Sequence, residues 1–480
     1  MTSTAKTCVA LIGLLALVAG GDAQEKKGGR GWQAGMPETF LTDIPAYEGN
    51  VILGRPTSHA VTLSVLSRDA VRATVTYGRA GAALASRTAA FELSARQPRE
   101  IVLDGLDSDT AYEYRVINAE TGEPLLPKEG NGRFHTDRAP GSPFTFTVTA
   151  DSHLDRNCSP ELYRITLANA LADKPDFHID LGDTFMTGKH PNRESAARQY
   201  DAQRYYFGLI GRAAPVFLVI GNHDGEEVRS PADMGADGLA VWSAQQRHRL
   251  FPNPVPDGFY TGNENLQPHV GLLQDYYAWT WGDALFVVLD PYWTSRSTRG
   301  GKEPWNMTLG KAQHEWLAHT LRASKAEWKF VFIHQLVGGL DRNGRGGAEA
   351  ASLFEWGGRE LDGRDTFATH RPGWEQPIHQ LLRETGVSIV FHGHDHLFAR
   401  QERGGIVYQL VPQPAHRDFR KHSAEEYGYK TGDFLPNSGH LKVRVEPERV
   451  MVEYVRAATP DMVRRGVGNA EIVFKYGLGQ

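Results

Sequence analysis

The sequence predicts a mixed α/β domain preceded by an all-β sandwich, and three observations support this. Residues 47–136 read as short runs of alternating apolar and polar residues, a pattern typical of antiparallel strands. From Phe144 onward, fully apolar strands alternate with helical stretches, which indicates a sheet covered on both faces. Between them, the Pro- and Gly-rich "DRAPGSP" marks a boundary. We therefore expect two domains within the 480 residues.

The N-terminus carries a candidate export signal. Lys6 precedes an apolar run from Cys8 to Val18, and small residues follow as far as Ala23. Because a membrane-spanning helix needs about 20 apolar residues, this run is typical of a cleaved signal, and a membrane anchor is the weaker alternative. We expect a signal peptide at 1–23 and a linker at 24–44. The mature protein is then predicted to be secreted or periplasmic, without a stable membrane anchor.

Composition limits the possible partners. The formal net charge is −5, with 23% charged residues. This mild acidity gives no electrostatic basis for binding nucleic acid or an anionic membrane, so no nucleic-acid partner is indicated. Once the signal is removed, Cys158 is the single remaining cysteine, so no intramolecular disulfide can form. We expect Cys158 to be a packed residue rather than a nucleophile.

The region 45–138 is predicted to be a sandwich of the fibronectin or immunoglobulin kind. Its strands include "AVTLSVLS", "RATVTYG", "REIVLDGL" and "AYEYRVIN", divided by Gly, Asp and Ser. No His or carboxylate side chains converge in it, so it is predicted to be a scaffold or docking module.

The region 142–458 is predicted to be the α/β domain. Helices are expected near 160–171, 193–210, 309–323 and 374–385. The apolar strands are "FTFTVTA", "FHIDLGD", "PVFLVI", "ALFVVLD", "KFVFIH" and "VSIVFHGHDH", and the strands "LKVRVEP" and "RVMVEYV" close the domain. Residues 459–480 are expected to be a C-terminal extension.

Side chains that commonly bind metal ions directly follow five of these strands. The carboxyl ends of parallel strands meet at one edge of a sheet, so we expect these side chains to converge there. A single His or Gly-Asp pair is weak evidence, because both are common in turns, but the same placement five times predicts a site for two metal ions. The residues are Asp151 and His153 in "ADSH", Asp183 in "GD", Asn222, His223 and Asp224 in "GNHD", His334 in "IH", and His394 and His396 in "GHDH".

The donor types indicate both metal and chemistry. Mixed nitrogen and oxygen donors favour divalent transition-metal ions such as Mn, Zn, Fe or Co over Mg or Ca. Two ions about 3.5 to 4 Å apart could share a bridging carboxylate and hydroxide, and they could clamp a phosphoryl group while the hydroxide attacks phosphorus in line. Water would be the nucleophile, so a Ser or Cys motif is not required.

The ordered series DxH, GD, GNHD, H and GHxH resembles the calcineurin-like metallophosphoesterase superfamily over about residues 144–455. The resemblance implies a four-layer α/β/β/α sandwich. It also implies that His223 stabilises or protonates the leaving oxygen and is oriented by Asp224. The implied ligands are Asp151, His153 and His396 for the first metal and Asn222, His334 and His394 for the second, with Asp183 bridging.

A sandwich ahead of such a domain is similar to the arrangement in purple acid phosphatases, with two departures. Those enzymes have a tyrosine ligand three residues after the GD aspartate, where this chain has Met186, and they lack the histidine that His153 supplies here. We therefore expect a colourless or faintly coloured enzyme that works with divalent metal.

Two long stretches beside the candidate ligands are expected to form a substrate rim, because long loops are often functional. One lies between Asp224 and His334, and the other is residues 335–365. Arg342 and Arg345 are candidates for hydrogen bonds to phosphate, or for solvated loop positions. A further set could be substrate-stacking or core aromatics, and core packing is the preferred interpretation: Tyr276, Tyr277, Trp293 and Trp356. Three histidines are expected to be structural: His178, His370 and His392.

The function predicted from these patterns is a secreted dimetal hydrolase of small-molecule phosphoric esters, acting as a phosphomonoesterase. The alternative is a phosphodiesterase acting on nucleotide or phospholipid-derived diesters. A non-catalytic binding protein is a third possibility, but such a relic should have lost ligands, and all the expected positions are filled.

Overall fold

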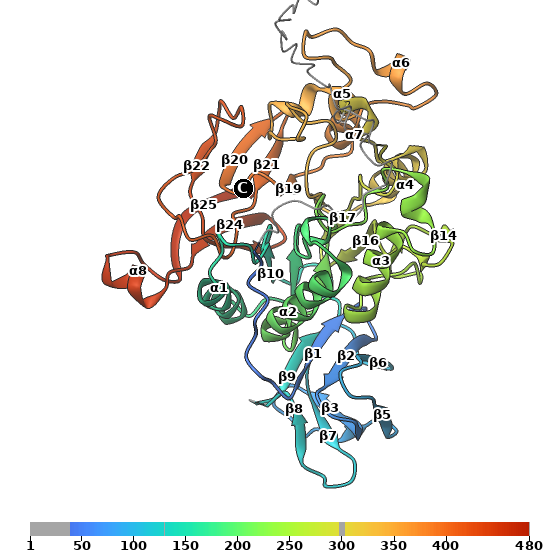
Figure 1. Ribbon diagram of the computed structural model, residues 1–480, viewed down its shortest axis with the longest axis vertical. Coiled ribbons are helices and arrows are strands. Elements are labelled where there is room, and N and C mark those ends of the chain that lie inside the picture. The colour runs from blue at the N-terminus through green and yellow to red at the C-terminus, as the bar shows by residue number, and fades with distance from the viewer. Residues whose placement is uncertain (1–38, 129, 297–302, 480) are drawn as a thin grey trace, which may run out of the picture.

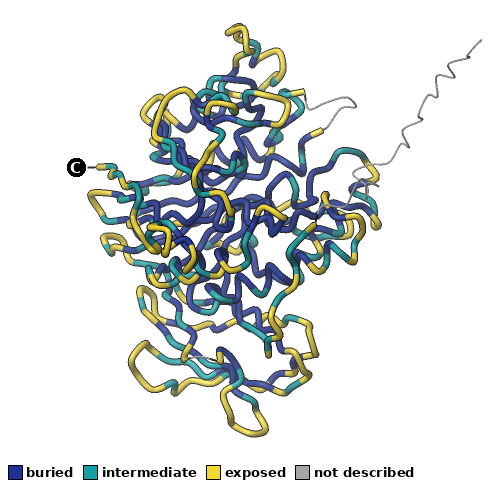
Figure 2. The backbone as a smooth tube through the Cα atoms, turned by 60° about the vertical axis from the view of Figure 1, so that its left-hand side comes forward, coloured by how far each residue is buried: buried dark blue, intermediate teal, exposed yellow. Residues whose placement is uncertain are grey.

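The computed structural model describes residues 39–128, 130–296 and 303–479. An all-β domain forms one end of the molecule, and a larger α/β domain forms the rest (Figure 1). Figure 2 shows buried backbone through the interior of the larger part and exposed residues mainly at its outer turns. The predicted signal peptide and most of the predicted linker lie outside the described residues. Within those residues, no helix has the length and apolar character needed to cross a bilayer.

The N-terminal domain has two antiparallel sheets packed around one apolar core, as predicted from its alternating runs. One sheet has the order β1-β2-β6, and the other has β4-β3-β7-β8 with β5 and β9 added to β3 and β7. The strands are β1 Gly49–Gly54, β2 Val61–Ser67, β3 Val71–Arg79, β4 Ser86–Arg87, β5 Phe91–Leu93, β6 Arg99–Leu103, β7 Ala111–Asn118, β8 Pro124–Leu126 and β9 Gly132–His135.

The first sheet of the α/β domain has the order β12-β11-β10-β23-β24-β25. Its first three strands are parallel, and β23 joins β10 in the antiparallel sense. The predicted C-terminal extension contains β25, which pairs along β24 and is therefore part of this sheet. The strands are β10 Phe144–Thr149, β11 Phe177–Asp180, β12 Val216–Leu218, β23 Gly439–Val445, β24 Arg449–Arg456 and β25 Glu471–Gly479.

The second sheet has the order β13-β16-β17-β18-β19-β21-β20-β22. Its central strands β17, β18, β19 and β21 are parallel. The strands are β13 Thr261–Gly262, β16 Tyr277–Trp281, β17 Ala284–Val288, β18 Trp328–Phe332, β19 Ile389–His392, β20 Phe398–Arg403, β21 Ile406–Leu410 and β22 Asp433–Leu435, with a separate small pair β14 Leu266–Gln267 and β15 Gly271–Leu272.

The two sheets face each other across an aromatic core that includes Phe146, Phe286 and Phe391. A second apolar cluster lies between the first sheet and helices α1 and α2, and a third lies between the second sheet and helices α4, α5 and α7. The layers are therefore α/β/β/α, as expected. The helices are α1 Pro160–Ala172, α2 Arg193–Gly211, α3 Leu239–Leu250, α4 Lys311–Ala323, α5 Phe354–Gly357, α6 Phe367–His370, α7 Ile378–Glu384 and α8 Pro460–Arg464.

Local sequence sets where the helices nearest the first sheet begin. The Ser159 hydroxyl accepts a hydrogen bond from the Leu162 N–H, and Pro160 occupies the first turn of α1. Asn192 caps α2 in the same way through the Ser195 N–H. Both helices start where the sequence predicts, because their caps are local.

Part of the stretch expected to be irregular, between Asp224 and His334, is regular structure. It contains α3, and "YAWTW" is the strand β16, which forms a hairpin with β17. The expectation that this stretch lacks regular structure was wrong, because much of it contributes to the core.

The two domains share packed surface. Helix α2 lies between the N-terminal domain and the first sheet (Figure 1), and Ile52 of β1 packs in the same cluster as α2. Arg204 of α2 is fully buried and donates to the Ser64 carbonyl oxygen at 2.7 Å and to Asn50 Oδ1 at 2.9 Å. Phe40, in the expected linker, stacks on His190 at 4.0 Å.

Candidate metal centre

The predicted metal-binding side chains all follow strand ends, but they come from two sheets. Asp151, Asp183 and Asn222 follow β10, β11 and β12 of the first sheet, whereas His334 and His394 follow β18 and β19 of the second. The expectation of one sheet edge was therefore wrong. The two sheets are stacked, so their carboxyl ends still meet.

The first group of candidate ligands consists of Asp151, His153 and His396, whose ligand atoms lie within 4.8 Å of one another. Asp151 Oδ1 is 3.7 Å from His153 Nε2 and 3.5 Å from His396 Nε2. Asp151 and His153 are buried, and His396 is partly exposed. Such a group can hold one ion and leave it open toward solvent.

The second group consists of Asp183, His334 and His394, within the same 4.8 Å limit. Asn222 joins it, since its Oδ1 lies 3.2 Å from His334 Nε2. Asp183 Oδ2 is 3.4 Å from His334 Nε2 and 3.7 Å from His153 Nε2 of the first group. Asp183 therefore lies between the two groups, where a bridging carboxylate is expected.

Two buried atoms in this site have no hydrogen-bond partner among the described residues: Asp151 Oδ1 and His153 Nε2. Unpartnered buried polar atoms are uncommon and costly, and here both face the other candidate ligands. Mixed imidazole and carboxylate donors suit Mn, Zn or Fe. The residues present therefore fit a dinuclear metal site.

The backbone at the site is in an unusual conformation. Asp151, His153, Asp183, His394 and His396 all have φ between 43° and 79°. Non-glycine residues rarely adopt this left-handed region, which costs of order 1–3 kcal/mol per residue when it is strained. Such conformations cluster at functional sites, so the turns are shaped to aim these side chains rather than for backbone stability.

The glycines that precede two candidate ligands allow two turns to touch. A Cβ on Gly182 would lie 2.4 Å from the Gly221 N, and a Cβ on Gly221 would lie 2.1 Å from the Asp183 N. No side chain fits between these backbones. The "GD" and "GNHD" turns therefore pack directly on each other, which brings Asp183 and Asn222 together.

In three of the four histidines that are candidate ligands, the ring nitrogen turned away from the site lies near a protein oxygen. His334 Nδ1 is 2.8 Å from the Leu181 carbonyl oxygen, and His394 Nε2 is 2.8 Å from the Asn343 carbonyl oxygen. His153 Nδ1 is 3.4 Å from Asp155 Oδ2. This outer hydrogen bonding fixes each ring and its tautomer, as is usual for metal-binding histidines.

The carboxylates and imidazoles of the site stabilise each other's charge. Burial opposes ionisation of Asp151, but His153, His334 and His396 hold its pKa below the usual range. Burial lowers the pKa of His334, while Asp183 and Asp151 raise it, with a net value of about 9. The carboxylates are therefore ionised at neutral pH and ready to bind cations.

His223 and Asp224 have different surroundings although they are adjacent. His223 is half-buried, lines the cavity beside the candidate ligands, and donates its backbone N–H to Asp183 Oδ1 at 2.7 Å. Asp224 is buried and accepts from the N–H groups of Asp183, Thr184, Phe185 and Gly221. Asp224 thus holds together the two turns that carry His223 and Asp183.

A cavity of about 360 Å³ opens over these groups. Such a volume suits a small-molecule ligand. Five lining residues are candidate ligands or His223, and the other five form its walls: Lys189, Arg229, Asn343, Arg345 and Tyr427.

Of the two arginines suggested by the sequence, Arg345 lines the cavity, whereas Arg342 is not among the described lining residues. Sequence reasoning missed Lys189, Arg229, Asn343 and Tyr427. Lys189 and Arg229 each lie a few residues beyond a motif, which is the signal that could have found them. Tyr427 lies far from every motif in sequence.

The aromatic and histidine candidates outside the site have structural surroundings, as expected. Tyr277 and Trp356 are buried in the cores on the two faces of the second sheet. His178 is buried within hydrogen-bond distance of Thr147 and Thr149, and His370 stacks on Trp305 at 4.3 Å. His392 and Cys158 are also buried, and burial raises the pKa of the Cys158 thiol to about 12.

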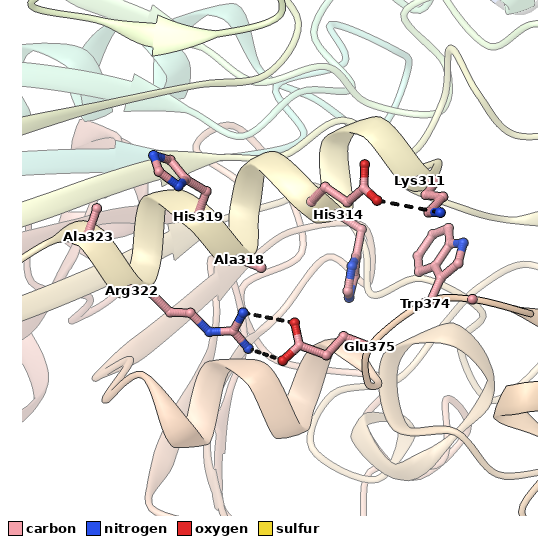
Figure 3. Close-up of a pocket in the computed structure, with 10 residues that line it drawn as sticks. Lys311, His314, Ala318, His319, Arg322, Ala323, Trp374 and Glu375 are labelled. Carbon is pink, nitrogen blue, oxygen red and sulfur yellow. Dashed lines mark hydrogen bonds and ion pairs between the residues drawn. The ribbon is translucent and has the colours of Figure 1, made fainter.

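Another hollow, of about 470 Å³, lies along α4 (Figure 3). Its charged groups are already paired, Arg322 with Glu375 and Lys311 with Glu315. It contains neither of the two His/Asp groups. The cavity over the metal-binding groups is therefore the better candidate site.

The fold and the two His/Asp groups define a metal-dependent phosphoesterase. The family model for calcineurin-like phosphoesterases matches residues 144–398, more than half of the chain. The chain therefore belongs to the calcineurin-like phosphoesterase family, and the expectation from the motif series is confirmed.

Two solved structures share the fold. One, described as the structure of PhoD, has a TM-score of 0.61 and 15% identity, over 91% of this chain and 92% of that chain. The other, purple acid phosphatase PPD1 from yellow lupin (Lupinus luteus) seeds, has a TM-score of 0.56 and 14% identity, over 90% of this chain and 74% of that chain. No curated protein matches the sequence. At these identities the similarity concerns the fold alone.

Proposed function

We propose that the protein is a secreted or periplasmic phosphomonoesterase that uses two divalent transition-metal ions, Mn, Zn or Fe. The export part of this proposal is supported by the sequence from Lys6 to Ala23. The catalytic part is supported by the cavity, which is lined by both candidate metal ligands and cationic residues.

The residues divide into two tasks. Asp151, His153 and His396 would hold one ion, and Asn222, His334 and His394 the other, with Asp183 shared between them. When bound, the ions would activate water and stabilise negative charge on the phosphoryl oxygens.

His223 is placed to act on the leaving group. Its side chain lines the cavity next to both groups of candidate ligands. A half-buried imidazole there can donate a proton to the leaving oxygen, as a general acid. Asp224 supports this role by fixing the turns on either side of His223.

The preference for monoesters is carried by the cations on the cavity wall. A monoester dianion has three non-bridging oxygens, one more than a diester. Arg229 is already paired with Glu227 at 2.7 Å, whereas Lys189 has no side-chain partner among the described residues. Arg345 lies 3.9 Å from Asp341, a longer ion pair. Lys189 and Arg345 are therefore the groups available to a third phosphate oxygen.

The test compares kcat/KM for an aryl phosphate monoester with that for the matching diester, on one Mn²⁺- or Zn²⁺-loaded preparation. A strong monoester preference is expected. A strong diester preference would instead support a phosphodiesterase of nucleotide or phospholipid-derived diesters. Hydrolysis of neither ester by fully loaded protein would contradict the proposal.

A further inference from the structure

Two loops meet at the mouth of the cavity. The first, residues 340–349, carries Arg345, and the second, residues 424–431, carries Tyr427. The Arg345 guanidinium carbon lies 4.1 Å from the centre of the Tyr427 ring, and both side chains line the cavity. An aromatic ring against a guanidinium holds the cation in place while leaving its N–H edge free to bind an anion.

Asp395 forms hydrogen bonds with both loops. It is buried and lies in sequence between His394 and His396. Its Oδ2 accepts a hydrogen bond from the Gly346 N–H at 2.8 Å and another from the Tyr429 hydroxyl at 2.7 Å. One carboxylate oxygen therefore bonds to Gly346, which follows Arg345, and to Tyr429, which lies two positions after Tyr427.

Further contacts connect the same loops to each other and to the candidate ligands. Glu349 Oε1 accepts from the N–H groups of Lys430 and Thr431, at 2.8 and 3.2 Å. The Asn343 carbonyl oxygen, two residues before Arg345, is 2.8 Å from His394 Nε2. The loop that carries Arg345 is thus attached on one side to a candidate metal ligand and on the other to Asp395.

The loop itself is tightly turned, so these attachments determine where Arg345 lies. Asp341 Oδ1 accepts from the N–H groups of Asn343 and Arg345, and the Leu340 N–H donates to the Arg345 carbonyl oxygen at 2.7 Å. A turn closed in this way moves as a unit. Releasing it at Gly346 would displace the guanidinium from the cavity.

We propose that Asp395 is a positioning residue for substrate recognition, which fixes the stacked Arg345 and Tyr427 over the cavity so that the guanidinium meets a phosphoryl oxygen of the ester. The inference rests on the proposed phosphomonoesterase function. It adds that recognition of the phosphate group depends on a carboxylate that touches neither metal nor substrate.

Three variants test this role. Asp395→Ala removes both hydrogen bonds, whereas Asp395→Asn retains one oxygen that can accept them. Tyr429→Phe removes only the hydroxyl and leaves Asp395 and its neighbours unchanged. Tyr408→Phe is the matched control, because Tyr408 is buried and its hydroxyl bonds to Trp356 and His379, away from the cavity.

Two measurements are made on metal-loaded protein, after metal content has been shown to equal that of the wild type. The first is KM and kcat for an aryl phosphate monoester. The second is the dissociation constant of inorganic phosphate by calorimetry, which does not depend on turnover. For Asp395→Ala, KM and the phosphate dissociation constant should both rise about tenfold or more with kcat within about twofold, as expected when a charge-assisted binding contact is lost. Tyr429→Phe should also raise KM and the phosphate dissociation constant. Asp395→Asn should bring both values much of the way back to those of the wild type.

The outcomes separate this inference from the proposed function. Wild-type values for phosphate binding and KM in both Asp395→Ala and Tyr429→Phe would overturn the positioning role even if the enzyme is a monoesterase. If the wild type hydrolyses no ester but binds phosphate, and the two variants weaken that binding, the positioning role stands and the proposed function fails. Equal weakening in Tyr408→Phe would show a general loss of stability and would also overturn the role.

Discussion

At the residue scale, Asn222 and His223 are neighbours with separate tasks. Both line the cavity, but Asn222 Oδ1 also lies beside His334 among the candidate ligands. The turn that carries them is fixed by Asp224 and by direct packing on Gly182. Two adjacent substitutions should therefore separate metal retention from chemistry.

We expect Asn222→Ala to reduce occupancy of the second metal, because it removes an oxygen donor. His223→Ala should leave both metals bound and lower kcat by about 10²-fold or more, the usual scale for a general acid. Metal analysis and steady-state kinetics on the same preparations check both. Unchanged turnover in His223→Ala would refute its assigned role.

Met186 gives a spectroscopic prediction. It is a buried residue three positions after Asp183, where purple acid phosphatases have a tyrosine ligand. A thioether cannot give the phenolate-to-iron charge-transfer band. We expect metal-loaded protein to be colourless or faintly coloured in a visible absorption spectrum. A strong band like that of the purple enzymes would count against divalent-metal use.

The candidate ligands could be predicted from sequence because each lies within a few residues of the end of a strand. Most of the cavity wall could not, because Asn343 and Tyr427 come to line the same cavity only when two loops distant in sequence fold together. Asp395 lies within the "GHDH" motif, but its role depends on contacts with Gly346 and Tyr429. Motif spacing contains no information about such contacts.

At the element scale, helix α3 and strand β16 were not predicted because neither follows the usual pattern of apolar and polar residues. Helix α3 buries Arg247, which forms an ion pair with Glu226 at 2.7 Å, so its inner face is not uniformly apolar. Strand β16 is buried at four of its five positions, including Tyr277, Ala278 and Trp279, so the usual alternation is lost. Helices α1 and α2 were predictable because their amphipathic patterns begin at local caps.

Helix α2 also carries a prediction about domain docking. Arg204→Met would leave the carbonyl oxygens of Ser64 and Leu250 and the side chain of Asn50 without this donor. We expect it to lower the free energy of unfolding by about 3 kcal/mol, because buried acceptors would be unsatisfied. Chemical denaturation of the purified protein measures this change.

The control is Arg198→Met on the same helix. Arg198 is exposed and, among the residues that the structure describes, forms an ion pair with Glu194 one turn away, an interaction of small value. Arg198→Met should therefore change the free energy of unfolding little. A similar loss in both variants would show that the effect comes from the helix surface rather than from the contact between the domains.

At the scale of the whole molecule, the N-terminal sandwich has its own apolar core but also packs against the α/β domain. Ile52 packs with residues of α1 and α2, and Tyr114 donates its hydroxyl to the Arg212 carbonyl oxygen at 3.0 Å. Arg138, between the domains in sequence, pairs with Asp176 at 2.6 Å. The sandwich predicted to be a scaffold or docking module is therefore also part of the packing around α2.

We expect this shared packing to give one cooperative thermal unfolding transition rather than two. Differential scanning calorimetry of the full chain checks this, with the ratio of calorimetric to van't Hoff enthalpy as the criterion. Two resolved transitions would show that the domains unfold independently. The Arg204→Met variant should broaden or split the transition if the contact at α2 couples them.

The order of strands in the first sheet has a consequence for how the protein is made. Strand β10, beside Asp151, pairs on one side with β11 and on the other with β23, where Phe144 lies opposite Val445. A nascent chain therefore cannot complete the sheet that carries four of the seven candidate metal ligands until β23, residues 439–445, has left the ribosome. Contacts so distant in sequence also slow folding. Activity should appear only after synthesis ends, and truncations that remove β23–β25 should not yield a working metal centre.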